Sequence, residues 1–110
     1  MPIIEIDSQD HFIEVLSNNQ YVIVDFYAKW CGPCKKIAPE FEQLSNDSIF
    51  KNVIFCKVDS DIVSEVADMC NVLQLPTFIA FDKKEVFDTL NNPTSDKIKE
   101  LLQDLITEDN

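Results

Sequence analysis

The stretch that decides the fold is residues 21–34, which read YVIVDFYAKWCGPC. Apart from one acid, its first seven residues are β-branched or aromatic, so apolar side chains would lie on both faces of a strand. Such a run is typical of a central strand that is buried on both sides. Apolar residues then recur at the spacing of one helix face, which predicts a strand that passes into a helix at two cysteines.

Outward from this unit, short apolar runs alternate with segments of helical periodicity. Strands are predicted over residues 3–6, 53–58, 76–81 and 85–90, with a turn at 82–84 between the last two. Helices are predicted after the cap Asp7-Ser8, after the cysteines with a kink at Pro39, over residues 62–69, and along the apolar face from Ile98 to Ile106. This order predicts an α/β sheet with an antiparallel edge.

The composition limits the class of protein. The chain has 110 residues, the length of one domain, so a single domain over residues 1–110 is expected. It carries 20 acidic residues and a net charge of −11, which disfavours nucleic acids and anionic membranes as partners. The chain contains one glycine, so a glycine-rich phosphate-binding loop is excluded.

Cysteine usage and the N-terminal sequence favour the cytoplasm. The first residues show neither a basic segment nor the apolar stretch of a secretory signal, and no run approaches the roughly 18 apolar residues of a membrane span. In the cytosol, closely spaced cysteines are more often catalytic or metal-binding than structural.

Cys31 and Cys34 are the candidate reactive groups, because they fall at the start of the helix that follows the buried strand. Unpaired N–H groups at a helix N-terminus stabilise a thiolate, so Cys31 is expected to have a lowered pKa and to be the nucleophile. Cys34, within the next turn, would be the resolving thiol of a dithiol/disulfide couple. The alternative is a zinc half-site, but Cys56 and Cys70 are too far apart for a second pair and His11 stands alone; no metal site is predicted.

Asp25 lies in the middle of the buried strand, where a carboxylate is costly to desolvate. Burial would raise its pKa towards neutrality, and a position beneath the cysteines would make it their proton acceptor. The alternative is a strand that is exposed on one face, with a solvated Asp25. Lys57, in the next buried strand, is the natural counter-charge, although a strand-end lysine that reaches solvent is an equally simple interpretation.

The residues quoted so far resemble the thioredoxin family over nearly the whole chain. Residues 30–35, WCGPCK, are the family's active-site motif without a change. Asp25 stands at its buried acid, Lys57 at the lysine partner, Pro39 at the helix kink, and residues 75–77 at the cis-proline loop. Sibling families usually carry another dipeptide between the cysteines, such as Gly-His in protein disulfide isomerase domains.

The resemblance implies a thioredoxin fold, with a central mixed sheet flanked by helices on both faces, and a general protein disulfide reductase. Cys31 would attack a client disulfide, Cys34 would resolve the mixed disulfide, and Asp25 would take the proton of Cys34. No cofactor would be bound, since the redox-active pair is the Cys31–Cys34 disulfide. Thioredoxin reductase and NADPH would reduce it again, and the protein would be a monomer whose clients include peroxiredoxins and reductases.

The resemblance also implies a client groove, and its expected residues are Trp30, Gly32, Pro33, Leu75, Pro76 and Asn92. A cis bond before Pro76 is a candidate from the sequence itself. Trp30 would be a platform for the client; the alternative is ordinary half-buried packing. A second functional interpretation is a thioredoxin-like protein that binds partners, or acts as a chaperone, according to its redox state.

The chain departs from the family at two turns, where Lys84 and Asn92 replace usual glycines. Asn tolerates left-handed backbone angles, but a side chain at Asn92 is expected to narrow the choice of client. The single glycine, Gly32, is expected to keep Cys31 open to a large client. Cys56 is predicted to be an inert core thiol, and Cys70 an exposed thiol that is a candidate for regulation by dimerisation or modification.

Overall fold

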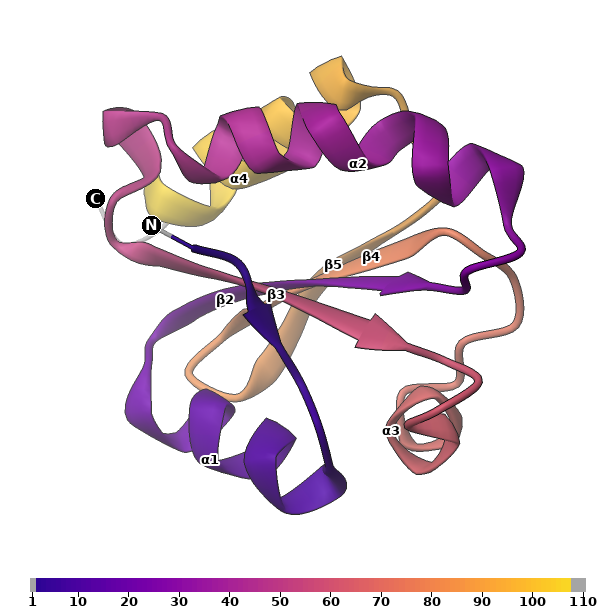
Figure 1. The fold of residues 1–110 in the computed structure, drawn as a ribbon. Helices are drawn as coiled ribbons and strands as arrows, with labels where there is room; N and C mark the ends of the chain where they lie inside the picture. The colour runs from indigo at the N-terminus through magenta and orange to yellow at the C-terminus, as the bar shows by residue number, and fades with distance from the viewer. Residues whose placement is uncertain (1, 108–110) are drawn as a thin grey trace.

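The computed structural model describes residues 2–107 and contains a five-stranded sheet between two layers of helices (Figure 1). Met1 and residues 108–110, which the predicted domain includes, lie outside the described residues. The strand order is β1-β3-β2-β4-β5. The strands are β1 (Ile4–Glu5), β2 (Tyr21–Tyr27), β3 (Val53–Asp59), β4 (Thr77–Asp82) and β5 (Glu85–Asn91).

The sheet is mixed, as the sequence predicts. β1 and β2 both pair with β3 in parallel, whereas β4 is antiparallel to β2 and to β5. The predicted central strand therefore lies between β3 and β4, and its five inner residues are buried. That burial explains why the run from 21 to 27 is apolar on both faces.

Helices cover both faces of the sheet (Figure 1). α1 (Gln9–Asn18) and α3 (Ser64–Met69) lie on one face, and α2 (Gly32–Ser45) and α4 (Ser95–Thr107) on the other. Ser8 caps α1 by accepting a hydrogen bond from the His11 N–H at 3.0 Å. Within the described part of the chain, no helix is long and apolar enough to cross a membrane.

Each face of the sheet has its own apolar core. On the side of α1 and α3, Phe12 packs edge-on against Phe81, with ring centroids 5.8 Å apart. On the other side, the ring centroid of Phe41 in α2 lies 5.2 Å from that of Phe78 and 5.3 Å from that of Phe55. Because the sheet is packed on both faces, the carboxyl end of β2 is held in a fixed position, and so are the residues that follow it.

The β4–β5 hairpin turns at Lys83 and Lys84, whose φ angles are 52° and 74°. Positive φ at both central residues is the geometry of a type I′ turn, which normally favours Asn or Gly. Asn92 also has a positive φ, 48°, as its replacement of a glycine predicts. β5 is an edge strand whose residues are mostly exposed, and β1, the other edge, has two residues.

The bounds of β1, β3, β4 and β5 differ from the prediction by one residue at one or both ends, and two larger differences lie outside the strands. α3 begins at Ser64 rather than at residue 62, because the N–H groups of Ile62 and Val63 both donate to the Asp59 oxygen in a turn, and Val63 is buried in the core. A short 3-10 helix, Ser48–Phe50, lies between α2 and β3 and was not predicted. Three residues are too few to show a periodic pattern.

Candidate active site

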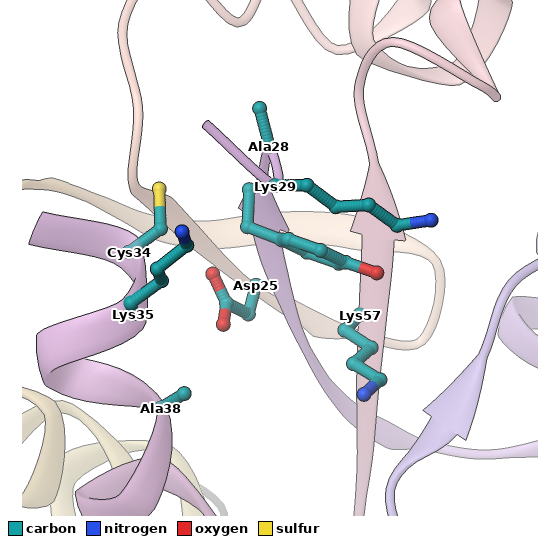
Figure 2. A pocket seen from close by; sticks show the side chains of 8 residues that line it. Asp25, Ala28, Lys29, Cys34, Lys35, Ala38 and Lys57 are labelled. Atoms are coloured by element: carbon teal, nitrogen blue, oxygen red, sulfur yellow. The ribbon is translucent and has the colours of Figure 1, made fainter. Parts of the chain in front are cut away.

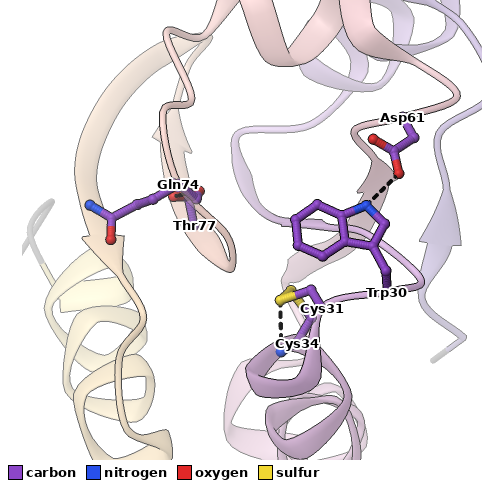
Figure 3. Close-up of a disulfide and its surroundings, with 6 residues drawn as sticks. All are labelled: Trp30, Cys31, Cys34, Asp61, Gln74 and Thr77. Carbon is purple, nitrogen blue, oxygen red and sulfur yellow. Dashed lines mark hydrogen bonds between the residues drawn. A yellow bond between two sulfur atoms is a disulfide. The ribbon is translucent and has the colours of Figure 1, made fainter.

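Cys31 and Cys34 form a disulfide at the N-terminus of α2 (Figure 3). Their Cα atoms are 5.3 Å apart. Cys31 is the N-cap residue, and its Sγ accepts a hydrogen bond from the Cys34 N–H at 3.3 Å. Since an N–H group of the first helical turn donates to this sulfur, the helix end favours negative charge on Cys31 once the disulfide is reduced.

The disulfide packs against the end of β2 and against the loop before β4. Ala28 is buried against the cysteines, and Leu75 packs on the same cluster. The Leu75–Pro76 bond is cis, as predicted, and the Asn92 N–H donates to the Pro76 oxygen at 2.8 Å. These contacts bring the predicted groove residues Leu75, Pro76 and Asn92 to the end of the sheet that carries the cysteines.

The side chain of Thr77 holds the loop before β4 in place through two hydrogen bonds. Its hydroxyl donates to the Gln74 backbone oxygen at 2.7 Å, and both residues are drawn in Figure 3. The hydroxyl also lies 2.9 Å from Asn91 Oδ1. Thr77 is 2% exposed, and both hydrogen bonds are partly buried. The loop before β4 is therefore held to the end of β5.

Trp30 is 71% exposed, so its interpretation as half-buried packing is wrong. Its indole Nε1–H donates to Asp61 Oδ2 at 2.8 Å, and Asp61 follows β3 (Figure 3). The hydrogen bond spans 31 positions. No signal in the sequence pointed to Asp61, because such a contact exists only after the sheet has formed.

Asp25 is 4% exposed in the middle of β2, so the alternative of a solvated carboxylate is wrong. Burial raises its pKa to about 7; the nearby Lys57 lowers it and Glu5 raises it further. Its Oδ1 is buried and has no hydrogen-bond partner among the described residues. A carboxyl group in this state can exchange a proton near neutral pH.

A pocket of about 360 Å³ brings Asp25 and Cys34 to one cavity. Lys57 and Lys35 also line it, and Figure 2 shows these side chains around the Asp25 carboxyl group. The pocket is open to solvent, and Lys35 and Ala38 of α2 form part of its wall. The predicted acid and the predicted resolving cysteine are thus in one site.

Lys57 combines the two alternatives that the sequence left open. It lies directly beside Asp25 in the register of β2 and β3. Its side chain is 42% exposed, however, and its Nζ lies 3.6 Å from Glu5 Oε1. Lys57 is therefore a neighbour of Asp25 that forms its ion pair with Glu5, to which no pattern in the sequence points.

Gly32 is not required by the fold. It has no positive φ, and a Cβ atom added to it would meet nothing within 4 Å. A side chain would therefore fit within the described structure. The expected advantage of glycine, which is to leave Cys31 open, would apply only when a client is bound. Pro33 and Asn92 line one shared hollow of about 340 Å³, on the side of α2 away from Asp25.

The other two cysteines are not bonded to each other. Cys56 is fully buried in β3, and burial raises its pKa to about 12, which makes it unreactive. Cys70 ends α3 and is half-buried rather than exposed; burial raises its pKa to about 11. Among residues 2–107, no group of three or more His, Cys, Asp or Glu side chains could hold a metal ion.

Comparison with known proteins gives consistent matches. The family model described as Thioredoxin matches residues 3–104. Thioredoxin 1 of Plasmodium falciparum is 41% identical over 89% of this chain and 92% of its own length, and the H-type thioredoxin of Chlamydomonas reinhardtii is 48% identical over 74% and 71%. A solved structure of thioredoxin from Plasmodium falciparum has a TM-score of 0.86, with 40% identity over 92% of this chain and 97% of that one.

Proposed function

Because the chain belongs to the thioredoxin family, has its fold and is a thiol-disulfide oxidoreductase, we propose that it is a general protein disulfide reductase. The observation that carries the proposal is the Cys31–Cys34 disulfide at a helix N-terminus, with the buried Asp25 carboxyl group in the adjoining pocket. The disulfide is itself the redox group, and a thioredoxin needs no bound cofactor.

In the proposed reaction the Cys31 thiolate attacks one sulfur of a client disulfide. The client S–S bond breaks, one client sulfur leaves as a thiolate, and a mixed disulfide with Cys31 forms. Cys34 then attacks the Cys31 sulfur, the S–S bond between Cys31 and the client breaks, and the second client sulfur leaves as a thiolate. Asp25 accepts the proton of Cys34, through water in the shared pocket. The client gains two electrons, and the protein returns to the disulfide form.

The client would bind at the surface around the disulfide. Trp30 supports this proposal because its large ring is exposed beside Cys31, and Leu75 because it packs against both cysteines. Pro76 would contribute to the same groove. The remaining proposed groove residues, Gly32, Pro33 and Asn92, lie at the start of α2 and at the end of β5.

The electron donor would be thioredoxin reductase with NADPH, and the clients would include peroxiredoxins and reductases. A cytoplasmic location is supported by the two unpaired cysteines, Cys56 and Cys70, since an oxidising compartment tends to pair thiols. We further propose that the 110 residues are one thioredoxin domain that acts as a monomer in electron transport.

The proposal is tested by the reduction of insulin disulfides with NADPH and a panel of thioredoxin reductases. Cys31→Ser should abolish the reaction, whereas Cys34→Ser should trap clients as mixed disulfides. Cys70→Ser, a control outside the site, should keep full activity. Turnover by the Cys31→Ser variant would overturn the assignment of the nucleophile.

A second candidate function is the binding of partners according to redox state, and the exposed indole of Trp30 beside the disulfide favours it. A partner that binds equally well to a variant lacking both Cys31 and Cys34 would support this function over reduction. A partner captured by Cys34→Ser and released by dithiothreitol would support the reductase.

A further inference from the structure

Three charged side chains form a row across three neighbouring strands. Glu5 in β1 is the register partner of Lys57 in β3, and Lys57 is the register partner of Asp25 in β2. Register partners in parallel strands present their side chains on the same face of the sheet. The row therefore runs from the edge of the sheet to the buried carboxyl group beneath the disulfide.

The contacts in this row are unequal. Tyr27 donates its phenolic hydrogen to the Glu5 carboxylate, with distances of 3.0 and 3.2 Å to the two oxygens. Lys57 Nζ is 3.6 Å from Glu5 Oε1 and 5.9 Å from the centroid of the Tyr27 ring. Figure 2 shows the ammonium end of Lys57 directed away from the Asp25 carboxyl group. At the inner end of the row, Asp25 Oδ1 has no hydrogen-bond partner among residues 2–107.

We propose that Glu5 is a positioning residue of the reaction: it holds the Lys57 ammonium at the outer end of the row, with Tyr27 fixing its carboxylate, and so keeps Asp25 able to take the proton of Cys34. This inference rests on the proposed role of Asp25 as proton acceptor. It adds a residue that does not line the pocket shared by Asp25 and Cys34.

The electrostatics support this direction. Burial raises the pKa of Asp25 to about 7, Lys57 opposes that rise, and Glu5 adds to it. If Lys57 turned inward to pair with Asp25, the pKa of the acid would fall and it would become a weaker base. Burial and the hydrogen bond to Glu5 also raise the pKa of Tyr27, so the phenol stays protonated and remains a donor.

The other groups near Asp25 do not replace Glu5. Lys29 and Lys35 line the same pocket, and their positive charges would lower the pKa of Asp25. Cys34 also lines it and is neutral as a thiol. On the β4 side the register partner of Asp25 is Phe78, which carries no charge. Glu5 is the acidic group that acts against Lys57. An exposed pair such as Glu5–Lys57 contributes at most about 1 kcal/mol to stability, so a structural role alone predicts little effect of its loss.

The test is Glu5→Gln, measured in the reduced protein. The titration of the Asp25 carboxyl carbon is followed by NMR, and the rate at which Cys34 resolves a preformed mixed disulfide is followed by stopped flow against pH. We expect the NMR midpoint and the pH profile to move to lower pH by about 0.5, and the plateau rate to fall about twofold. Tyr27→Phe should shift both midpoints in the same direction by a smaller amount.

Two further variants separate the proposed route from a general charge effect. Asp7→Asn removes one negative charge from the same segment, but Asp7 lies beside His11 and is not in the row, so the midpoint should not move. In a Lys57→Gln background, Glu5→Gln should shift the midpoint less than in the unmodified protein, because its effect runs through Lys57. Glu5→Asp, which keeps the charge, should restore part of the original midpoint.

An unchanged or raised midpoint in Glu5→Gln, or equal shifts with and without Lys57, would overturn the role of Glu5. Failure of the proposed function has a different signature: Asp25→Asn would leave the rate and pH profile of the resolving step unchanged. The NMR titration reports on Glu5 in either case, and equal urea midpoints of the variants exclude a folding defect as the cause.

Discussion

At Asp25 a carboxyl group is removed from water in the middle of the central strand, with one oxygen unpaired among the described residues. A group in this state is stabilised when it is protonated and destabilised when it is charged. The folded protein therefore binds a proton that the unfolded chain releases near pH 4. Stability and chemistry are linked at this residue through a single proton.

The sign of that linkage predicts a pH-dependent stability. The pKa of Asp25 is raised from 3.8 to about 7, so its stabilising contribution is present below pH 4 and is lost as the pH rises to 7. Relative to Asp25→Asn, the oxidised protein should lose roughly 4 kcal/mol of unfolding free energy between pH 4 and 8. Urea unfolding of both proteins at several pH values measures this, and parallel curves would contradict it.

Trp30 and Asp61 allow a second prediction at the scale of residues. Asp61→Ala removes the acceptor of the indole N–H, so Trp30 should become more mobile and kcat/KM for a protein client should fall about fivefold. Trp30 is the one tryptophan of the chain, so fluorescence anisotropy reports its mobility directly.

Asp61→Asn, whose amide oxygen still accepts, is the matched control and should keep most of the activity. Reduction by dithiothreitol should be equal in all three proteins, because a small dithiol needs no platform. A client rate that is unchanged in Asp61→Ala would show that the orientation of Trp30 is unimportant.

At the scale of elements, the β4–β5 hairpin holds two lysines at positive φ. A non-glycine residue in this region costs about 1 kcal/mol or more. Lys84→Gly should therefore raise the free energy of unfolding by about 1 kcal/mol, as measured in urea. Lys99→Gly, at an exposed site inside α4, should lower it by about as much. A loss of stability in Lys84→Gly would mean that its side chain contributes contacts that outweigh the backbone strain.

Most elements could be predicted because their hydrophobic pattern is local. The apolar residues of the run 21–27 are enough to predict a buried strand, and the predicted bounds equal those of β2. The start of α3 could not be predicted, since Val63 is drawn into the core by tertiary packing rather than by local preference. In the site, the cysteines, Asp25 and the cis Pro76 follow from sequence order.

The partners of Lys57 and Trp30 could not be predicted, because Glu5 and Asp61 reach them only through strand pairing and loop placement. A sequence read along the chain contains no distance between the β1 edge and the end of β3. The charged row is therefore a property of the assembled sheet.

At the scale of the whole molecule, the two free cysteines should report different motions. Cys56 is fully buried in β3, whereas Cys70 is half-buried at the end of α3. In the oxidised protein a thiol reagent should modify Cys70 through local motion, and Cys56 at least about a thousandfold more slowly, at a rate set by global unfolding. Mass spectrometry of the labelled protein checks both rates. Similar rates for the two cysteines would show that the core around β3 opens locally.

The two edges of the sheet have a consequence for behaviour at high concentration. An exposed edge strand is a template on which another chain can add a strand and begin to aggregate. Here one edge, β1, is two residues long, and the other, β5, displays Glu85 and Asp88 on a chain of net charge −11. Neither edge offers a long uncharged ladder to a second molecule. Heat-denatured chains that regain this sheet should therefore return to solution as separate molecules rather than grow into fibrils.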